Sequence, residues 1–167
     1  MIRLAFMTDD SLMIGYDNPE GNAHRFKIIP ETLWPQLDKI LEGDHYLCGS
    51  KSIVFYRDNN YGEGKKLYIL SRDPHFTFEG KANTEVTTNY MDLVEKFKDS
   101  DEVLVVIGGK IIFELMLPYA KEVDIVYADT IVPGNVKFDA WKSADLSLVN
   151  SEKWDGGTTY YYKQEVR

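Results

Sequence analysis

The sequence predicts an α/β fold: a central mixed sheet of mostly parallel strands, flanking helices and an antiparallel hairpin at the C-terminal end. Three observations support this prediction. Residues 103–107 are five consecutive apolar residues, which is typical of a strand buried on both faces. A diglycine ends this strand, and an amphipathic run up to Leu117 follows, closed by Pro118. Near the end of the chain, a turn at 155–157 separates two long strand-like segments.

Strands are expected wherever apolar or alternating residues run between turn-forming residues. The first of them has the pattern of a central strand, and the last two form the hairpin. In order, the expected strands are residues 2–7, 46–48, 67–70, 85–88, 103–107 and 122–131, followed by the two hairpin strands after residue 144.

Three helices are expected from apolar residues at helical spacing, over 30–41, 90–98 and 110–117. The first begins at Pro30 and Glu31, because proline suits a first helical turn and a carboxylate favours the positive helix end. Ser50 and Ser52 could also cap a short helix toward Tyr56, whereas residues 8–23 are rich in Asp, Asn, Gly and Pro and indicate a long loop. With neither repeat nor linker, residues 1–167 are expected to form a single domain.

Composition excludes several classes of function. The net charge of -8 argues against nucleic acid as a partner, because proteins that track phosphates need basic patches. No apolar run approaches the roughly 18–20 residues that span a bilayer, so no membrane association and a cytoplasmic location are expected. Cys48 has no partner cysteine and suits a small buried hydrophobe. His24, His45 and His75 are isolated from one another and from Cys48, so no metal site is expected.

Polar residues follow three of the buried strands directly. In an open α/β sheet, the carboxyl ends of the strands are where ligands bind. Hydroxyl groups, cations and free backbone N–H groups at that edge would suit a phosphorylated cofactor. The alternative is that the serines are only turn formers and helix caps. The three motifs are Gly49-Ser50-Lys51-Ser52, Ser71-Arg72 and Gly108-Gly109-Lys110.

The chain resembles the dihydrofolate reductase superfamily over nearly its whole length. The resemblance is closest in 106–114, an aliphatic-Ile-Gly-Gly turn followed by an aromatic residue, and in 117–123, which begins with a Leu-Pro-x-Ala helix end. Further matches are Ile14-Gly15 at the start of the family's active-site loop, 49–52 at its Gly-Arg-x-Thr motif, 67–72 at the strand that grips the 2′-phosphate of NADPH, and 129–138.

This resemblance implies NADPH-dependent hydride transfer to a pterin-like ring. By carry-over, the cofactor-binding residues are Ile14, Gly15, Gly49, Ser50, Lys51, Ser52, Ser71, Arg72, Ile107, Gly108, Gly109, Lys110 and Ile111. The substrate-binding residues are Met7, Leu33, Leu37, Phe113 and Val126, and the catalytic candidates are Glu31 and Thr32. Arg72 favours NADPH over NADH, since a guanidinium forks onto phosphate oxygens.

The departures from the family pattern concern the proton donor. The family's folate reductases carry an acid at the position of Thr32, where it binds the pterin and promotes protonation of the imine. Glu31 lies one residue early, about 100° around a helix, and is also explained by the helix dipole. The threonine that normally binds this acid is replaced by Val126, and the arginine of the cofactor motif is replaced by Ser50.

Without the folate acid, the chain resembles a related branch of the superfamily, the reductase domain of riboflavin biosynthesis (RibD C-terminal-like). That branch reduces a ribosyl sugar on an aminopyrimidine. Residues 122–125 and 71–73 are similar to segments of that branch, which usually dimerises, so a homodimer is possible. The Leu-Pro-x-Ala helix end is closer to folate reductases. Two functions therefore stay open: a reductase acting on a pterin or on a riboflavin-pathway aminopyrimidine, and a non-catalytic protein that binds NADPH or pterin.

Overall fold

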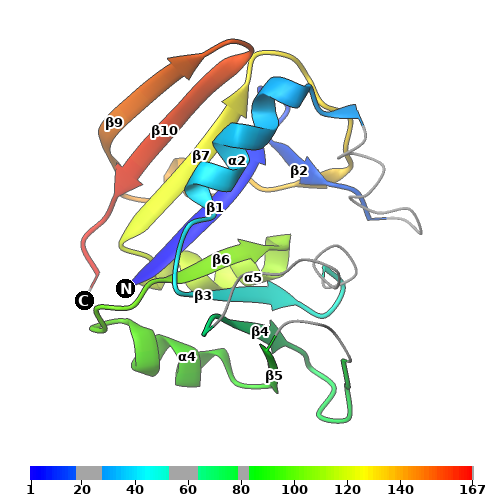
Figure 1. Ribbon diagram of the computed structural model, residues 1–167, viewed down its shortest axis with the longest axis vertical. Coiled ribbons are helices and arrows are strands. Elements are labelled where there is room, and N and C mark those ends of the chain that lie inside the picture. The colour runs from blue at the N-terminus through cyan, green and yellow to red at the C-terminus, as the bar shows by residue number, and fades with distance from the viewer. Residues whose placement is uncertain (18–27, 53–63, 79–82, 167) are drawn as a thin grey trace. The chain divides into compact units, whose positions relative to one another are not determined.

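The computed structural model describes residues 1–17, 28–52, 64–78 and 83–166 of the chain (Figure 1). Its strands are β1 (Ile2–Thr8), β2 (Met13–Gly15), β3 (His45–Gly49), β4 (Lys66–Leu70), β5 (Asn83–Thr87), β6 (Leu104–Gly108), β7 (Glu122–Ala128), β8 (Val136–Lys137), β9 (Ser147–Trp154) and β10 (Gly157–Lys163). Eight of them form one sheet in the order β5-β4-β3-β6-β1-β7-β10-β9, and β2 pairs with β8 in a separate small sheet.

The helices are α2 (Trp34–Ile40), α4 (Tyr90–Phe97), α5 (Lys110–Met116) and the single turn α6 (Ala140–Ser143), within the described residues. A 3-10 turn, η1 (Glu31–Leu33), leads into α2, and a second, η2 (Leu117–Tyr119), follows α5. The predicted fold is confirmed: the sheet is mixed and mostly parallel, β1 is a central strand, and β9 and β10 form the antiparallel hairpin.

The structure differs from the sequence prediction in several elements, including the start of the first helix, where Glu31–Leu33 is a 3-10 turn. The strand expected over 122–131 ends at Ala128, because its antiparallel partner β10 begins at Gly157, which is paired with Ala128. The expected loop contains β2, and β8 and α6 are also additional elements. The short helix expected toward Tyr56 falls on residues that lie outside the described ranges.

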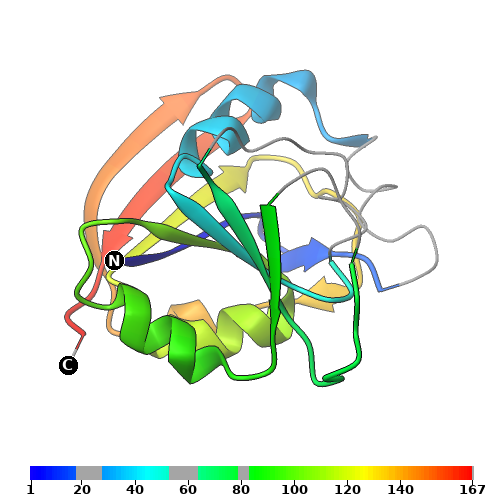
Figure 2. The same ribbon diagram turned by 60° about the horizontal axis from the view of Figure 1, so that its bottom comes forward.

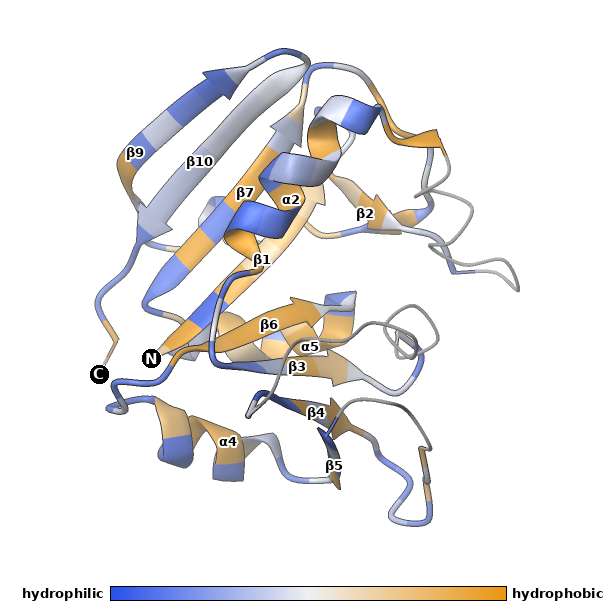
Figure 3. Cartoon of the chain, in the orientation of Figure 1, coloured by the Kyte–Doolittle hydropathy of each residue, from blue (hydrophilic) through white to orange (hydrophobic). Residues whose placement is uncertain are grey.

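The chain divides into two compact units, the first comprising 1–4, 43–120 and 166–167, and the second 5–42 and 121–165. In the first unit β3 lies between β4 and β6, all three parallel, and β5 continues the sheet beyond β4. Helices α4 and α5 run along one side of these strands (Figure 2). Figure 3 shows β6 as hydrophobic along its length, in agreement with the burial of all five of its residues.

Cys48 lies in the middle of this sheet with no exposed surface, and burial raises the pKa of its thiol to about 12. The thiolate is the reactive form, so the native protein is expected not to react with a thiol reagent at pH 8. After unfolding in guanidinium chloride, one equivalent is expected to react. Stoichiometric labelling of the native protein would contradict this burial.

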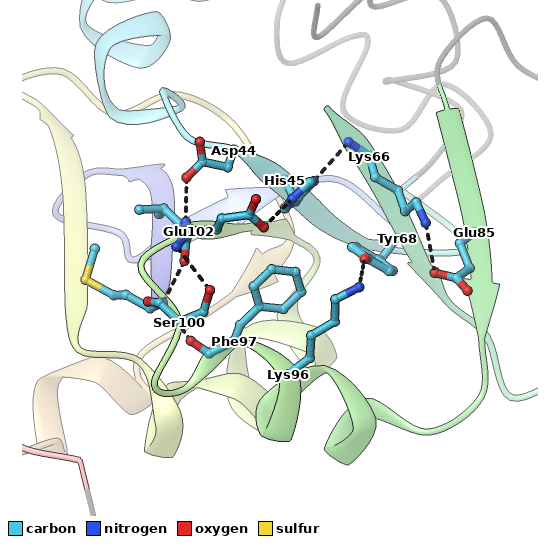
Figure 4. Close-up of polar contacts among 11 residues, drawn as sticks. Asp44, His45, Lys66, Tyr68, Glu85, Lys96, Phe97, Ser100 and Glu102 are labelled. Carbon is cyan, nitrogen blue, oxygen red and sulfur yellow. Dashed lines mark hydrogen bonds and ion pairs between the residues drawn. The ribbon is translucent and has the colours of Figure 1, made fainter. Parts of the chain in front are cut away.

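Polar and aromatic residues form a group of hydrogen bonds and ion pairs near the amino-terminal ends of β3 and β4 (Figure 4). His45 contacts Glu102 through Nε2 at 2.9 Å, while its Nδ1 accepts the backbone N–H of Lys66 at 3.2 Å. The Lys96 ammonium donates to the hydroxyl of buried Tyr68 at 3.0 Å, and this hydrogen bond raises the pKa of Lys96. These hydrogen bonds join β3, β4, α4 and the segment before β6, and so stabilise this end of the first unit.

In the second unit, β10 pairs antiparallel with both β7 and β9, and α2 packs against β7 (Figure 1). Lys39 of α2 pairs with Glu152 of β9 at 2.7 Å, and Tyr161 donates to the same carboxylate at 3.3 Å. The pairing of β9 with β10 shifts by one residue between Tyr161 and Tyr162, which leaves Val149 as a bulge.

None of the helices in the described residues is long and apolar enough to cross a membrane.

Candidate functional site

The carboxyl ends of β3, β4 and β6 meet at one edge of the first unit. The register pairs Gly49 of β3 with Leu70 of β4, and Cys48 of β3 with Gly108 of β6. Beyond the strands, Ser50 donates its N–H to the carbonyl of Leu70 at 3.2 Å. The parallel register therefore gathers the three polar motifs that follow these strands at the same edge.

The Ser52 hydroxyl lies against the diglycine that follows β6. The Ser52 N–H donates to the Gly49 carbonyl at 3.0 Å, which closes a tight turn after β3. A Cβ atom placed on Gly109 would lie only 3.2 Å from Ser52 Oγ, and one on Gly49 would lie 3.1 Å from Ile112 Cγ1. The absence of a side chain at Gly109 therefore lets its backbone lie close beside the Ser52 hydroxyl, and both groups carry polar hydrogens that an anion can accept.

Glycine is required at Gly108 by its backbone conformation, because its φ of +133° is one that L-amino acids rarely adopt. The peptide bond between Gly108 and Gly109 is cis. Phe113 of α5 is buried, and its ring lies about 3.8 Å from where a Cβ of Gly108 would stand. Gly109 is the residue that precedes the first turn of α5.

Ser71 and Arg72 follow β4 at this edge. Ser71 is buried, donates its N–H to the Thr87 carbonyl at 3.0 Å, and accepts the Asp73 N–H at its Oγ at 3.1 Å. These bonds fix the turn that carries Arg72. The Arg72 side chain is exposed, and its guanidinium makes no ion pair or hydrogen bond with any residue in the described part of the chain.

The other residues predicted for this site differ in accessibility. Lys51 is exposed in the turn after β3. Lys110 is also exposed and lies 3.7 Å from the Glu114 carboxylate, one helical turn on. Ile111 is 52% exposed, whereas Ile107 is buried in β6. Three exposed cations (Lys51, Arg72 and Lys110) and the Ser52 hydroxyl at one edge make this surface suited to a polyanionic ligand.

The remaining predicted residues lie in the second unit. Ile14 and Gly15 belong to β2, whose Gly15 carbonyl accepts the Asn135 N–H at 3.0 Å. Four apolar residues predicted to bind substrate are buried within the unit: Met7 in β1, Leu33 in η1, Leu37 in α2 and Val126 in β7. Val126 has no exposed surface, so it could affect a bound substrate only through the residues that it packs against.

The two catalytic candidates are exposed neighbours in η1. Glu31 occupies the first turn, so its carboxylate is open to solvent. Thr32 is directed toward the hairpin, since its Oγ1 lies 3.3 Å from where a Cβ of Gly156 would stand. The hydroxyl of Thr32 is thus against the turn between β9 and β10.

Asp9 and the neighbouring Asp10 have structural roles that the sequence did not indicate. Asp9 is completely buried just after β1. Asp10 is exposed and accepts the Tyr127 hydroxyl at 2.7 Å. Burial, followed by this hydrogen bond and the nearby charge of Asp10, raises the pKa of Tyr127 to about 12. The sequence does show two adjacent acids after a predicted strand. Because residues 8–23 are rich in loop-forming residues, however, the sequence predicts that these acids are part of a loop.

The family model described as dihydrofolate reductase matches residues 62–166, more than half of the chain. The chain belongs to the dihydrofolate reductase family. Its matched part includes Ser71, Arg72 and the Gly108-Gly109 motif of the edge described above. None of the curated proteins matches the chain in sequence.

Solved structures support the same fold. The chain is similar to a dihydrofolate reductase from Enterococcus faecalis complexed with NADP(H) and RAB-propyl, with a TM-score of 0.71, 16% identity, and coverage of 99% of this chain and 97% of that one. It is also similar to a diaminohydroxyphosphoribosylaminopyrimidine deaminase/5-amino-6-(5-phosphoribosylamino)uracil reductase from Thermotoga maritima, with a TM-score of 0.68 and 14% identity. That match covers 98% of this chain but only 56% of the longer relative.

Proposed function

We propose that this chain is an NADPH-dependent reductase that transfers hydride to a pterin or to a riboflavin-pathway aminopyrimidine. The observation that carries this proposal is the edge of the first unit. There, the Ser52 hydroxyl lies against the Gly108-Gly109 turn, at the same edge as the solvent-exposed Arg72. Family membership and a neighbour solved with NADP(H) support the choice of cofactor.

The residues of this edge fit the charged parts of NADPH. The backbone of Gly108 and Gly109 and the hydroxyl of Ser52 would hold the pyrophosphate, because backbone N–H groups and a hydroxyl group can donate hydrogen bonds to phosphate oxygens. Arg72 would bind the 2′-phosphate with two parallel N–H donors, and Lys51 would add a second cation. Bound NADPH supplies the hydride, and the protein binds and orients it.

The proton has to come from a group other than the family's usual acid. Glu31 directly precedes Thr32, the position of the family's acid, and is the carboxyl group nearest to that position in sequence. Its side chain is exposed, so water can reach it. It would deliver a proton to the nitrogen of the reduced C=N bond, directly or through one water molecule. Within the second unit, Met7, Leu33 and Leu37 would provide apolar walls for the ring.

Replacing Glu31 by glutamine tests this role. The proposal expects Glu31→Gln to lower kcat by about a hundredfold, in line with the usual contribution of a general acid, with little change in KM for NADPH. Because Glu31 is exposed, the fold should keep its melting temperature. The measurement is steady-state turnover against pH. A rate equal to that of the wild type would remove Glu31 as the proton source and leave water in that role.

A second function is favoured by the pair of changes at Thr32 and Val126. A threonine cannot ionise, and its hydroxyl lies against the hairpin turn, while valine cannot donate a hydrogen bond. A cofactor site can persist without a proton donor. The alternative is therefore a protein that binds NADPH or a pterin without turnover.

Two measurements separate these functions. Calorimetry gives NADPH binding, and the absorbance of NADPH gives turnover with dihydrofolate and with the aminopyrimidine in separate reactions. Oxidation with one substrate supports a reductase and identifies its branch. Binding without oxidation by either favours the non-catalytic function, and absence of NADPH binding contradicts both.

A further inference from the structure

Asp9 is a carboxylate with no exposed surface, located directly after β1 in the second unit. A carboxylate is costly to bury unless hydrogen-bond donors replace its water. Here both oxygens have donors. Oδ1 accepts the N–H of Ser11 at 2.9 Å and also the Ser11 hydroxyl, and Oδ2 accepts the N–H of Val132 at 2.8 Å.

The first two bonds shape the turn that leads into β2. The Leu12 N–H donates to the Asp9 carbonyl at 2.9 Å, and Leu12 adopts a left-handed conformation with a φ of +62°. The Ser11 hydroxyl, while donating to Asp9, accepts the Met13 N–H at 3.3 Å. Thr8, also completely buried, donates its hydroxyl to the Met13 carbonyl at 3.1 Å. Met13, the first residue of β2, is thus held at both its N–H and its carbonyl.

The third bond reaches the other strand of the small sheet. Val132 is buried in the connection between β7 and β8. Met13 and Gly15 of β2 pair with Lys137 and Val136 of β8. One carboxylate therefore ties the end of β1 to the turn before β2 and to the segment before β8.

We propose that Asp9 is a positioning residue that fixes the β2–β8 ribbon and thereby holds Ile14 and Gly15 in the orientation that NADPH binding requires. This inference rests on the proposed function and on the family resemblance, which implies that Ile14 and Gly15 bind the cofactor. Asp9 has no exposed surface with which to contact a cofactor or substrate. Its effect is transmitted through the backbone of Met13, whose two polar groups are bonded to Ser11 and Thr8.

The test compares Asp9→Asn with Thr159→Val. Asparagine keeps the size of the side chain but turns one acceptor into an NH2 donor that faces an N–H or O–H group. Thr159 is a matched control, because it is also buried in the second unit and accepts the Trp154 indole N–H at 3.1 Å, with no bond to β2. Both variants are expected to melt at lower temperature than the wild type.

Two readouts distinguish positioning from general destabilisation. Only Asp9→Asn is expected to speed amide hydrogen exchange in residues 11–16 and to raise the dissociation constant of NADPH, each by about tenfold. Ser11→Ala leaves the carboxylate in place and is expected to give a smaller effect of the same kind. If Asp9→Asn does not fold, Ser11→Ala replaces it in the same two measurements.

The outcomes separate this inference from the proposed function. Unchanged exchange, or unchanged NADPH affinity in variants of a wild type that binds NADPH, overturns the positioning role alone. An equal loss of affinity in Thr159→Val also overturns it, since the loss would then follow from reduced stability. A wild type that does not bind NADPH contradicts the proposed function and, with it, this inference.

Discussion

Gly108→Ala is expected to lower the affinity for NADPH at least tenfold and to destabilise the fold. The φ of +133° at this position strains any residue with a Cβ atom, at a cost of about 1–3 kcal/mol. Space is not the obstacle, because the nearest ring atoms of Phe113 would lie at an ordinary contact distance of 3.8 Å. Rotation of the backbone would relieve the strain and would also displace the Gly109 N–H, which the proposed function assigns to the pyrophosphate. Calorimetry with NADPH measures this loss.

Gly64→Ala is the matched control for this substitution. Gly64 also has a positive φ, +79°, but a Cβ there would have no neighbour within 4 Å among the described residues, and the residue precedes β4 at its amino-terminal end. A similar loss of stability is expected, with NADPH affinity unchanged. If the two variants weakened NADPH binding equally, the role of Gly108 at the pyrophosphate would be refuted.

Arg72→Gln is expected to weaken NADPH binding by about tenfold to a hundredfold while leaving NADH binding unchanged. A hydrogen-bonded ion pair with the 2′-phosphate contributes about 1.5–3 kcal/mol, and NADH lacks this phosphate. The Arg72 side chain is exposed, so its loss should not change the melting temperature. The measurement is the ratio of the two dissociation constants at a fixed salt concentration.

The control for charge is Lys163→Gln. Each variant removes one positive charge from a chain of net charge -8, but Lys163 is an exposed residue at the end of β10. It is expected to leave both dissociation constants unchanged. Arg72→Lys retains the charge without the planar fork and should give an intermediate ratio. A parallel fall in NADPH and NADH affinity in Arg72→Gln would show that Arg72 does not bind the 2′-phosphate.

The elements that were predictable from sequence are those whose pattern is local. Strand β6 is a continuous apolar run bounded by glycine, and α4 has its apolar residues on one face, so both were located to within a residue or two. The small strands β2 and β8 carry no such pattern. Each is only two or three residues long and exists because the other is present, through pairing over more than a hundred residues of sequence.

The candidate site divides in the same way. The motif after β6 was evident because glycine at a strand end indicates an unusual backbone, which the φ of Gly108 confirms. The burial of Asp9 was not evident, since one of its two carboxylate oxygens is satisfied by Val132, 123 residues away. The orientation of Thr32 toward Gly156 depends on the position of the hairpin, which is likewise remote in sequence.

The bulge at Val149 has a consequence for how the sheet ends. Strand β9 is the outermost strand on its side, and its exposed aliphatic side chains, Leu148 and Val149, are 53% and 56% accessible. A further strand added to this edge would meet evenly spaced donors and acceptors only up to the bulge, where the extra residue twists the backbone and interrupts the ladder. Growth of the sheet into an open, repeating assembly is thereby opposed by one inserted residue.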